Sequence, residues 1–512
     1  MLNSNKFQLV GNRYEQIYQF SKNVRKNLPE FNLYLIDNLD NSIQNRLIQI
    51  LLSYIELYFK QNLGNPDKLV PNNFSLKGKV SFLNYKISVS FMHWLECIIK
   101  YNLLSAYIYF RFLKSRFSQI FLKKNSVNDG HALLFGGPRD LNVKIIYEFV
   151  QASPLIFNSE IPLITQTAKL QAYKNIDVAK YPLLKLLEKS RFSFFECINF
   201  SLTHFLNILL SNFKFISSPI TALLASDLPW MSVAKLLNER RSICEVYITN
   251  TYYINQPLWM TSLKNKRFRL SFIWYSVNCN GLYWIEKNGE KYIPMFPAYY
   301  CLNIDHSFYW FEGHKKVFEN IFFKKPSSTI VGPTLFYKNT IKDTPEKKND
   351  LIITIFDVTA LSMAWAEDNN IPENYYSHIV VKKFLDDIKS IAERLQTSLD
   401  RTVILRLKHK REYAPIHDNE YIDYVSSIIE SGKVELIDIN DNIYEVVGGS
   451  DIVISLPFTS TAYIADSMDV TSIFYDPTNI LIDNLYYHSE NLFFIQNKDE
   501  LFETVYQSLK RD

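Results

Sequence analysis

The chain has few cysteines, few glycines and no long uninterrupted apolar run. Its five cysteines form no CxxC pair and have no short spacing to histidine, which argues against a zinc site and a disulfide framework. No stretch reaches about 18 uncharged apolar residues, so we predict no membrane-spanning helix. The start of the chain lacks the basic, apolar and small-residue succession of a secretory signal. These absences predict reduced thiols and a cytoplasmic location.

The signature loops of several enzyme classes are also missing. The sequence has no GxGxxG after a strand and no GxxxxGK[ST], which argues against dinucleotide enzymes and P-loop NTPases. It has neither the GxSxG elbow nor the HExxH zinc motif. The net charge of +4 is too small to indicate nucleic-acid binding. We therefore expect no metal, no cofactor and no nucleic-acid partner.

The composition that remains is that of a globular protein with several domains. Hydrophobic residues make up 47% of the chain and charged residues 21%, and 512 residues predict two or three domains. Apolar spacings of three and four predict a mostly helical N-terminal region over residues 1–130. The segments 88–113 and 193–225 are rich in Phe, Leu and Ile but carry charges. We predict buried core helices there, with a peripheral contact to the inner face of the cytoplasmic membrane as the alternative.

After residue 130 the pattern changes to short apolar strands that alternate with helical runs. Strands are predicted at 132–135, 154–158, 243–249 and 269–276. Such alternation is typical of a parallel sheet covered by helices. Residues 131–328 are therefore predicted to form a Rossmann-like domain, and the TIVGP segment at 329–333 a hinge.

The alternation is clearest after the hinge. Five strands (351–356, 402–407, 434–438, 451–456, 470–475) alternate with four helices (377–399, 420–432, 442–447, 459–468). Runs of β-branched residues without polar alternation indicate strands buried on both faces. We predict a second Rossmann-like domain over 329–490, and a closing helix within 491–512 that packs back across the domain interface. The predicted fold class is α/β.

One loop of this second domain has the composition of an anion site. In an open parallel sheet, ligands bind beyond the carboxyl ends of the strands. The loop after the strand at 451–456 contains Ser455, Pro457, Phe458, Thr459, Ser460 and Thr461. Hydroxyls and free backbone amides at the start of a helix bind phosphate without a metal. The alternative is that Thr459 only caps the helix.

Basic residues crowd the end of an earlier strand of the same domain: Arg406, Lys408 and His409, followed by Lys410 and Arg411. We expect these cations to face the hydroxyl loop across the crevice and to hold a nucleotide's phosphate with charge-assisted hydrogen bonds. The alternative is a solvated charged surface. Asp357 and Thr359 follow the first strand of the domain and are further candidates for the nucleotide site.

The run Ser455-Leu-Pro-Phe-Thr-Ser460, between Asp451-Ile-Val-Ile and Thr461-Ala, resembles the signature of the bacterial polysaccharide biosynthesis PFTS motif proteins. The late strand, proline, Ser/Thr and helix also resemble GT-B glycosyltransferases, more loosely those that use CMP-activated acidic sugars. In such enzymes a basic-His element and a Ser/Thr-rich helix start hold the CMP. Lys408-His409 and Thr459-Ser460-Thr461 would take those places, although Lys410 stands where the His-Pro motif has proline.

The resemblance implies a GT-B-like enzyme with the nucleotide in the second domain and the acceptor in residues 131–320. An acceptor hydroxyl needs a base within hydrogen-bond reach. Asp140 after the Gly-Gly-Pro turn is the first candidate, followed by Glu160 and Asp227. Glu312 and His314, beside the hinge, are candidates for donor-site contacts or hinge contacts.

The resulting hypothesis is a metal-independent glycosyltransferase of capsule or lipopolysaccharide biosynthesis. Its donor would be a CMP-activated nonulosonate (a sialic- or pseudaminic-type acid) or Kdo, and its acceptor an oligosaccharide or lipid-linked glycan. A UDP-, GDP- or dTDP-sugar donor is the alternative within this class. The second class is a non-catalytic nucleotide- or sugar-binding protein of the same pathway.

Overall fold

The protein is described from a computed structural model. The residues that the structure describes are 46–47, 49–50, 81–82, 85–86, 91–121, 130–136, 143–158, 160–166, 175–217, 219–249, 256–263, 265–274, 276–277, 283–285, 291–292, 302–319, 322, 324–334, 350–360, 377–408, 417–438, 441–457, 459–479, 481–482 and 489–510. Most of the predicted helical region 1–130 lies outside these residues. Its last helix, α3 (Phe91–Phe121), is confirmed.

The first large sheet is parallel throughout, and its strands run in the spatial order β11-β10-β7-β6-β3-β4-β5. The strands are β3 (His131–Phe135), β4 (Leu163–Thr165), β5 (Ile176–Val178), β6 (Ile243–Thr249), β7 (Arg269–Ile273), β10 (His306–Tyr309) and β11 (Ser327–Ile330). The first strand, β3, therefore lies in the middle of the sheet. Strands β4 and β5 are added on one side of it, and from β6 onward the strands are added on the other side, so the strand order reverses between β3 and β6. This is the strand order of a Rossmann fold, and the reversal is its ligand-binding switch point.

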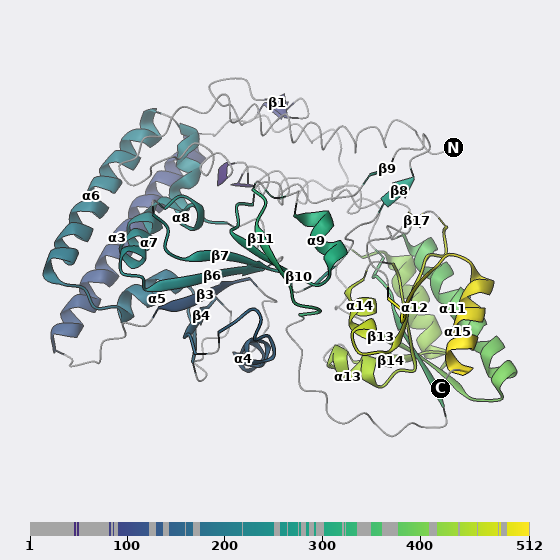
Figure 1. Cartoon of the computed structure of the whole chain (residues 1–512). Helices are drawn as coiled ribbons and strands as arrows, with labels where there is room; N and C mark the ends of the chain where they lie inside the picture. Colours follow the sequence, from purple (N-terminus) through teal and green to yellow (C-terminus); the bar gives the residue numbers. More distant parts are fainter. Residues whose placement is uncertain are drawn as a thin grey trace.

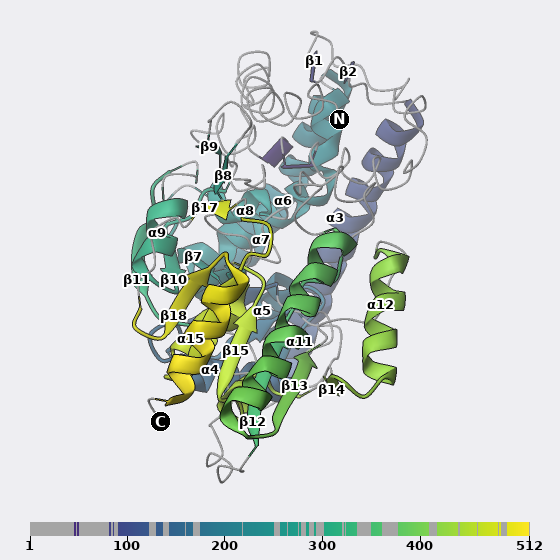
Figure 2. The same cartoon turned by 90° about the vertical axis from the view of Figure 1, so that its right-hand side faces the viewer.

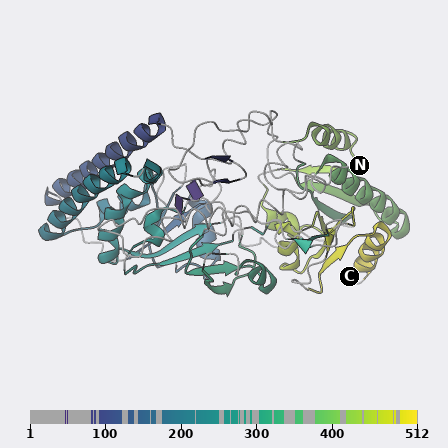
Figure 3. The same cartoon turned by 90° about the horizontal axis from the view of Figure 1, so that it is seen from above.

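Helices cover both faces of this sheet. They are α4 (Val143–Ala152), α5 (Pro182–Lys189), α6 (Phe194–Ser217), the 3-10 helix η2 (Pro219–Ser226), α7 (Leu228–Glu239), α8 (Leu258–Thr261) and α9 (Glu312–Phe318). The two longest helices, α3 and α6, lie side by side at the end of the molecule opposite the second sheet (Figures 1 and 3). They reach the sheet through α5, α7 and η2, which they contact.

The second large sheet repeats the same topology in the order β14-β13-β12-β15-β16-β18, again parallel throughout. Its strands are β12 (Leu351–Phe356), β13 (Val403–Lys408), β14 (Glu435–Ile437), β15 (Ile452–Ser455), β16 (Thr471–Tyr475) and β18 (Leu492–Ile495). Its helices are α11 (His378–Leu399), α12 (Asn419–Glu430), α13 (Ile443–Gly448), α14 (Ser460–Asp466) and α15 (Lys498–Lys510). The α/β prediction of two Rossmann-like domains in succession is confirmed.

Local sequence explains why these helices begin where they do. The side chain of Asp418 accepts hydrogen bonds from the amides of Glu420 (2.9 Å) and Tyr421 (3.2 Å) at the start of α12. Asn442 does the same for Tyr444 at the start of α13, at 3.0 Å. These caps satisfy amides that have no partner inside the helix, and each is worth about 1 kcal/mol.

The two domains meet through helices α13 and α14, which cover the face of the second sheet turned toward the first domain (Figure 1). Their buried side chains join the hydrophobic core of the first domain in one cluster. Helices α11, α12 and α15 cover the outer face (Figure 2). The short strand β17 (Leu481–Ile482) also pairs antiparallel with β8 (Tyr283–Ile285), which in turn pairs with β9 (Lys291–Tyr292). A two-stranded pair, β1 (Ser81–Phe82) and β2 (Tyr85–Lys86), lies apart from these sheets.

Several predicted boundaries are wrong. The strand predicted at 154–158 is a turn, because the amides of Ile156 and Phe157 bond back to the carbonyl of Ser153. The hinge predicted at 329–333 begins inside β11, which pairs with β10. The boundary predicted between residues 490 and 491 separates β18 and α15 from the second domain, to which both belong. Helix α15 packs on α11 and β18 of its own domain, and it does not return across the interface.

The prediction of buried core helices is wrong for α6. By length and composition it is the one helix among the described residues that could cross a membrane, yet only 22% of its most apolar 18-residue window is buried. Large apolar side chains of α3 and α6 point outward instead.

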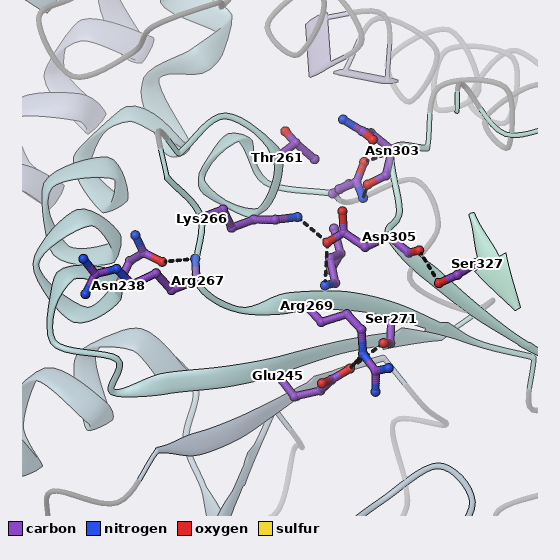
Figure 4. Close-up of polar contacts among 12 residues, drawn as sticks. Asn238, Glu245, Thr261, Lys266, Arg267, Arg269, Ser271, Asn303, Asp305 and Ser327 are labelled. Atoms are coloured by element: carbon purple, nitrogen blue, oxygen red, sulfur yellow. Dashed lines mark hydrogen bonds and ion pairs between the residues drawn. The ribbon is translucent and has the colours of Figure 1, made fainter. Parts of the chain in front are cut away.

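Polar contacts at the amino-terminal edge of the first sheet hold its strands together (Figure 4). The carboxylate of Asp305, just before β10, accepts from the amide of Leu270 at 2.8 Å and pairs with Lys266. Between β6 and β7, Arg269 Nε donates to Glu245 at 2.8 Å. Because these groups bond one another within the fold, this edge has a structural role. The carboxyl edge is the place for ligands.

Candidate functional site

The switch point of the second sheet lies between β12 and β15. Phe356 and Ser455 are register partners at the ends of these strands, and Leu456 N donates to the carbonyl of Phe356 at 3.0 Å. The loops that leave the two strands, which begin at Asp357 and Leu456, therefore start side by side. The predicted hydroxyl loop is one of these two loops, so it lies at the switch point of the sheet, which is where open parallel sheets commonly bind ligands; its role in binding stays a prediction.

Three buried hydroxyls form a chain in this loop. Thr461 Oγ1 lies 3.1 Å from both Ser455 Oγ and Thr459 Oγ1. Thr459 is the N-cap residue of α14, but its side chain makes no capping hydrogen bond. The predicted alternative, in which Thr459 only caps the helix, is therefore not what the structure shows. Two hydrogen bonds use two of the three O–H hydrogens, and the third has no acceptor among the described residues, so it can donate to a ligand oxygen.

Ser460 reaches across to the first domain. Its hydroxyl accepts a 2.8 Å hydrogen bond from the amide of Val277, which follows β7 at the carboxyl edge of the first sheet. Three residues further along α14, the ring of Tyr463 lies 4.7 Å from that of Phe311, which follows β10. The start of α14 is thus in contact with both domains. Ser460 is a domain contact, and Pro457 in the same loop is buried.

The predicted cations do not face the hydroxyl loop. Lys408 is buried, and its ammonium donates to the carbonyl of Asp438 and, at 3.0 Å, to that of Asp441. Arg406 pairs with Glu435 across β13 and β14 at 3.2 Å. Both point toward the outer strand β14, whereas the hydroxyl loop follows β15 on the other side of β12. The predicted phosphate clamp between the two loops is wrong for these residues. His409 and Phe458 lie outside the described residues.

Lys408 instead has a structural role. It binds two carbonyls of the loop that joins β14 to α13, and burial lowers the pKa of its ammonium. Hydrogen bonds from a cation to carbonyl oxygens are stronger than neutral ones. Lys408 therefore fixes the course of this loop.

Asp357 is buried at the switch point, as expected for a residue directly after β12. Its Oδ2 accepts a 2.5 Å hydrogen bond from the hydroxyl of Tyr421 on α12. Thr359 is half-buried in the same loop. The carbonyl of Ala360 accepts from the amide of Asp418 at 2.9 Å, which fixes the loop against the start of α12. The position of Asp357 and Thr359 beside the hydroxyl loop agrees with the prediction, and their role in binding stays a prediction.

His314 is a core residue, and the prediction that it contacts the donor site is wrong. Its ring packs 4.9 Å from Trp274 and 5.2 Å from Phe318, and its Nδ1 accepts from the amide of Trp310 at 3.3 Å. Burial lowers its pKa to about 3, so it is neutral at physiological pH. Glu312, at the start of α9, is exposed and pairs with Lys315 on the same helix.

A cavity of about 200 Å³ lies at the switch point of the first sheet. It is lined by residues at or after the ends of β3 to β6 and by residues of α5, η2, α7 and α8: Phe135, Gln166, Lys180, Tyr181, Pro182, Leu183, Ser226, Asp227, Trp230, Pro257 and Trp259, together with Arg46. Aromatic walls with a few polar groups are typical of sites that bind sugar rings or other small polar ligands. Sequence reasoning identified only Asp227 of this set.

Asp227 is held by strong contacts in the cavity wall. Arg46 Nε lies 2.6 Å from its Oδ2, Arg46 Nη2 lies 3.2 Å from its Oδ1, and the amide of Leu258 donates to Oδ2 at 3.0 Å. The contact with Arg46 is a charge-assisted pair, and the Leu258 amide adds a backbone hydrogen bond to the same carboxylate. Arg46 belongs to the N-terminal region, far away in sequence, so no local motif could have revealed this pair.

The other two residues predicted as catalytic bases are Glu160 and Asp140, and the structure describes only the first. Glu160 lies in the turn before β4 and is exposed, so it stands at the amino-terminal edge of the sheet, away from the cavity. That position does not suit a base that acts at the carboxyl edge. Asp140 lies outside the described residues and stays a prediction. Within the described ranges, no group of three or more His, Cys, Asp or Glu residues could hold a metal ion.

Solved structures with a similar course of the chain include a polymerase, a glycosyltransferase and a protein bound to UDP and glucose. A variant of the wall teichoic acid polymerase TagF with CDPG is 9% identical, with a TM-score of 0.38, covering 83% of this chain and 92% of TagF. HepE of Anabaena with UDP and glucose is 11% identical, with a TM-score of 0.37 and coverages of 74% and 90%. A glycosyltransferase of Rickettsia africae is 13% identical, with a TM-score of 0.37 and coverages of 75% and 89%. Such distant likenesses do not identify a donor or an acceptor.

Among curated proteins, none matches the sequence significantly. The family model "Polysaccharide biosynthesis PFTS motif protein" matches residues 205–505, which is more than half of the chain. The matched region runs from α6 to α15 and includes the hydroxyl loop at the domain contact. The chain therefore belongs to the polysaccharide biosynthesis PFTS motif family.

Proposed function

We propose that this protein is a GT-B-like glycosyltransferase of bacterial polysaccharide biosynthesis. It transfers a sugar from a nucleotide donor bound in the second domain to a glycan acceptor bound in the first. The nucleotide site comprises the loops after β12 and β15, with Asp357, Ser455, Thr459 and Thr461. The acceptor site is the cavity around Asp227 at the carboxyl edge of the first sheet.

One observation carries this proposal: the family's motif lies where loops from the carboxyl edges of the two sheets meet. Val277 and Phe311, which follow strands of the first sheet, contact Ser460 and Tyr463 of α14. Ligands of Rossmann-like sheets bind at these edges. Donor and acceptor held on two facing edges can be brought together for transfer. A single nucleotide-binding domain would not need the second switch point or its cavity.

The chemistry assigned to the site is electrostatic. When the glycosidic bond to the nucleotide breaks, negative charge grows on the leaving phosphate, and donors placed in advance stabilise it. The unpaired O–H of the hydroxyl chain and the amides near it supply such donors without a metal. The acceptor hydroxyl loses its proton to a base, for which Asp140 remains our first choice. Asp227 is the second, and it would act only after rearrangement of its contact with Arg46.

For the donor we propose a CMP-linked acidic sugar first, followed by UDP-, GDP- and dTDP-sugars. The support is the sequence resemblance of the element β15–Pro457–Thr459–α14 to CMP-dependent transferases. The position of Lys408 removes one part of that resemblance. The alternative function, a non-catalytic binding protein of the same pathway, is favoured by the engagement of Asp227 with Arg46.

The nucleotide site is tested with a thermal-shift panel of CMP, UMP, UDP, GDP and dTDP on the full chain. A nucleotide at 100 times its dissociation constant adds about 2.7 kcal/mol to the free energy of unfolding. We expect one nucleotide to raise the melting temperature. Thr461→Val, which removes one hydroxyl of the chain, should weaken that binding roughly tenfold or more.

The matched control is Ser467→Ala at the other end of α14, where the hydroxyl bonds only to the carbonyl of Ile464. This variant should bind as the wild type does. If no nucleotide stabilises the protein, or if the two variants bind equally well, the assignment of the nucleotide site is wrong.

Turnover separates the enzyme from the binding protein. With the nucleotide found in the panel, we expect release of that nucleotide from the corresponding nucleotide-sugar when an acceptor glycan is present. Asp140→Asn should abolish release and leave nucleotide binding unchanged. Binding without release under any acceptor would favour the non-catalytic alternative.

A further inference from the structure

Helix α6 has its polar side inward and its apolar side outward. Its buried residues are Phe200, His204, Asn207, Ser211 and Phe215, at spacings of three and four. The opposite face carries large apolar side chains that are 41–81% exposed: Phe194, Phe195, Ile198, Leu202, Phe205, Leu206, Leu209, Leu210, Phe213 and Ile216. A surface helix of a water-soluble domain has the reverse arrangement.

The inward polar groups are bonded to neighbouring helices. His204 Nδ1 lies 2.6 Å from Ser232 Oγ of α7, and its Nε2 lies 3.1 Å from the carbonyl of Ser105 on α3. The side chains of Asn102 on α3 and Asn212 on α6 exchange two hydrogen bonds, at 3.0 and 2.9 Å. Polar residues that join helices from the inside, with apolar residues outside, are typical of helices that face lipid.

Helix α3 extends the same apolar surface. Met92, Ile99, Leu103, Phe110 and Phe117 are 50–71% exposed and share one face at spacings of four and seven. Over the described residues, 17 of the 21 exposed large hydrophobic side chains belong to α3 or α6. The two helices lie side by side (Figures 1 and 3). We call this outward face of the two helices the α3–α6 face. An apolar surface of this extent marks an interaction site.

The charges on and beside the α3–α6 face are mainly positive. Helices α3 and α6 hold five Lys or Arg residues against two Glu, and two of the five are engaged within the fold: Arg111 pairs with Glu188, and Arg116 donates to backbone carbonyls. Lys100 and Lys114 are exposed on α3 at the flank of the apolar stripe, and Arg191 is exposed just before α6. Glu196 is paired with Arg240, and Glu96 is exposed beside His93. An apolar surface with a basic rim matches an anionic bilayer, because lysines reach headgroups while the apolar side chains enter the acyl region.

We propose that the α3–α6 face docks this protein on an anionic lipid bilayer, with both helices in the plane of the interface. The helices lie on the membrane and do not cross it, because the inward polar face of α6 is bonded to α3 and α7. Helix α7 also supplies Trp230 to the cavity of the first domain, so docking holds that cavity near the lipid surface. This proposal does not depend on the transferase assignment.

The test is co-sedimentation of the full chain with vesicles of phosphatidylcholine alone and of phosphatidylcholine with phosphatidylglycerol. We expect the wild type to bind the anionic vesicles more tightly, and to lose part of that preference at high salt. The variant Phe205→Gln/Leu209→Gln/Phe213→Gln should reduce the partition coefficient about tenfold or more. Lys100→Gln/Lys114→Gln should reduce binding to anionic vesicles only.

The matched control changes two exposed apolar residues of the second domain, Ile379→Gln and Leu436→Gln, which are 67% and 49% exposed. It should bind vesicles as the wild type does. Circular dichroism melting shows whether each variant is folded. Sedimentation velocity without lipid gives the oligomeric state.

Three outcomes would overturn the proposal. The first is absence of binding to both vesicle types. The second is equal loss in the control and in the α6 variant. The third is a wild-type oligomer that the α6 variant converts to a monomer while vesicle binding is unchanged, since the face would then be an interface between copies of the chain.

Discussion

Two long helices of this chain, α6 and α11, have opposite polarity. Helix α11 buries Val381, Phe384, Ile388 and Leu395 against the second sheet and turns charged residues outward. Helix α6 buries a histidine, an asparagine and a serine, and turns leucines and phenylalanines outward. Both helices are amphipathic and of similar length, with 22 and 24 residues. The difference is which side each one turns toward the protein.

This difference shows that apolar content alone does not place a helix in the core. Helix α11 follows the rule for a domain in water, where the apolar stripe faces the sheet. Helix α6 breaks that rule between its two buried phenylalanines, Phe200 and Phe215, and the polar groups of its inward face make specific hydrogen bonds to α3 and α7. The outer face of α11 is therefore polar, as is usual for a helix in contact with water. The outward face of α6 in the first domain is apolar, as is usual for a helix in contact with lipid.

The largest effect is expected from the same substitution made in the two helices. Phe384 is fully buried and Phe205 is 59% exposed. Phe384→Ala leaves a cavity and should lower the free energy of unfolding by about 3–5 kcal/mol. Phe205→Ala should change it by less than about 0.5 kcal/mol. Guanidinium denaturation of the full chain followed by circular dichroism measures both, and equal losses would mean that the outward face of α6 is covered in solution.

A smaller effect is expected from pH, because the inward face of α6 contains a histidine and that of α11 does not. Burial lowers the pKa of His204 below its ordinary value of 6.5. Below about pH 6.5 the unfolded chain therefore binds a proton that the folded chain does not, and stability falls until the pH reaches the folded pKa. The slope is at most about 1.4 kcal/mol per pH unit for this group. His314, with a pKa lowered to about 3, adds a loss of the same sign between about pH 6.5 and 3.

Urea denaturation at pH 7.5 and pH 5.0 checks this, with His204→Gln as the comparison. The variant should be less stable than the wild type at pH 7.5 and should lose less between the two pH values. A wild type that is as stable at pH 5.0 as at pH 7.5 would contradict the burial of both histidines.

The sequence predicted the second domain almost element by element, and the reason is physical. Its strands are continuous β-branched runs, and its helices begin at strong caps such as Asp418 and Asn442. Strand β18 (Leu492–Ile495) was missed because the prediction relied on strands that alternate with helices, and no helix was predicted between β16 and β18. In the first domain the short strands β4 and β5 were missed because three residues give too little pattern to recognise.

The site was predicted less well than the fold. The hydroxyl loop was found because strand, proline and a Ser/Thr run are neighbours in sequence. The partners of Lys408 and Arg406 were not predicted, because they depend on the order of the strands in the sheet. Strand β14 lies beside β13, which carries both cations, and β12 lies between β13 and β15. The cavity wall was found only at Asp227, since its other residues come from distant loops. The polar spacing His204, Asn207, Ser211 was a readable signal for the orientation of α6.

The smallest effect concerns the amide pair Asn102 and Asn212, which joins α3 to α6. Each side chain donates to the other's oxygen, and each also donates to a backbone carbonyl four residues earlier, that of Ile98 or Ile208, at 2.9 Å. A double-mutant cycle with Asn102→Ala and Asn212→Ala should give a coupling of about 0.5–1 kcal/mol in the free energy of unfolding. If α6 faces lipid, the coupling should persist in vesicle-bound protein, because the pair lies on the protein side of both helices. A coupling near zero in solution would mean that the two helices are not held together by polar contacts, and the contrast with α11 would then rest on exposure alone.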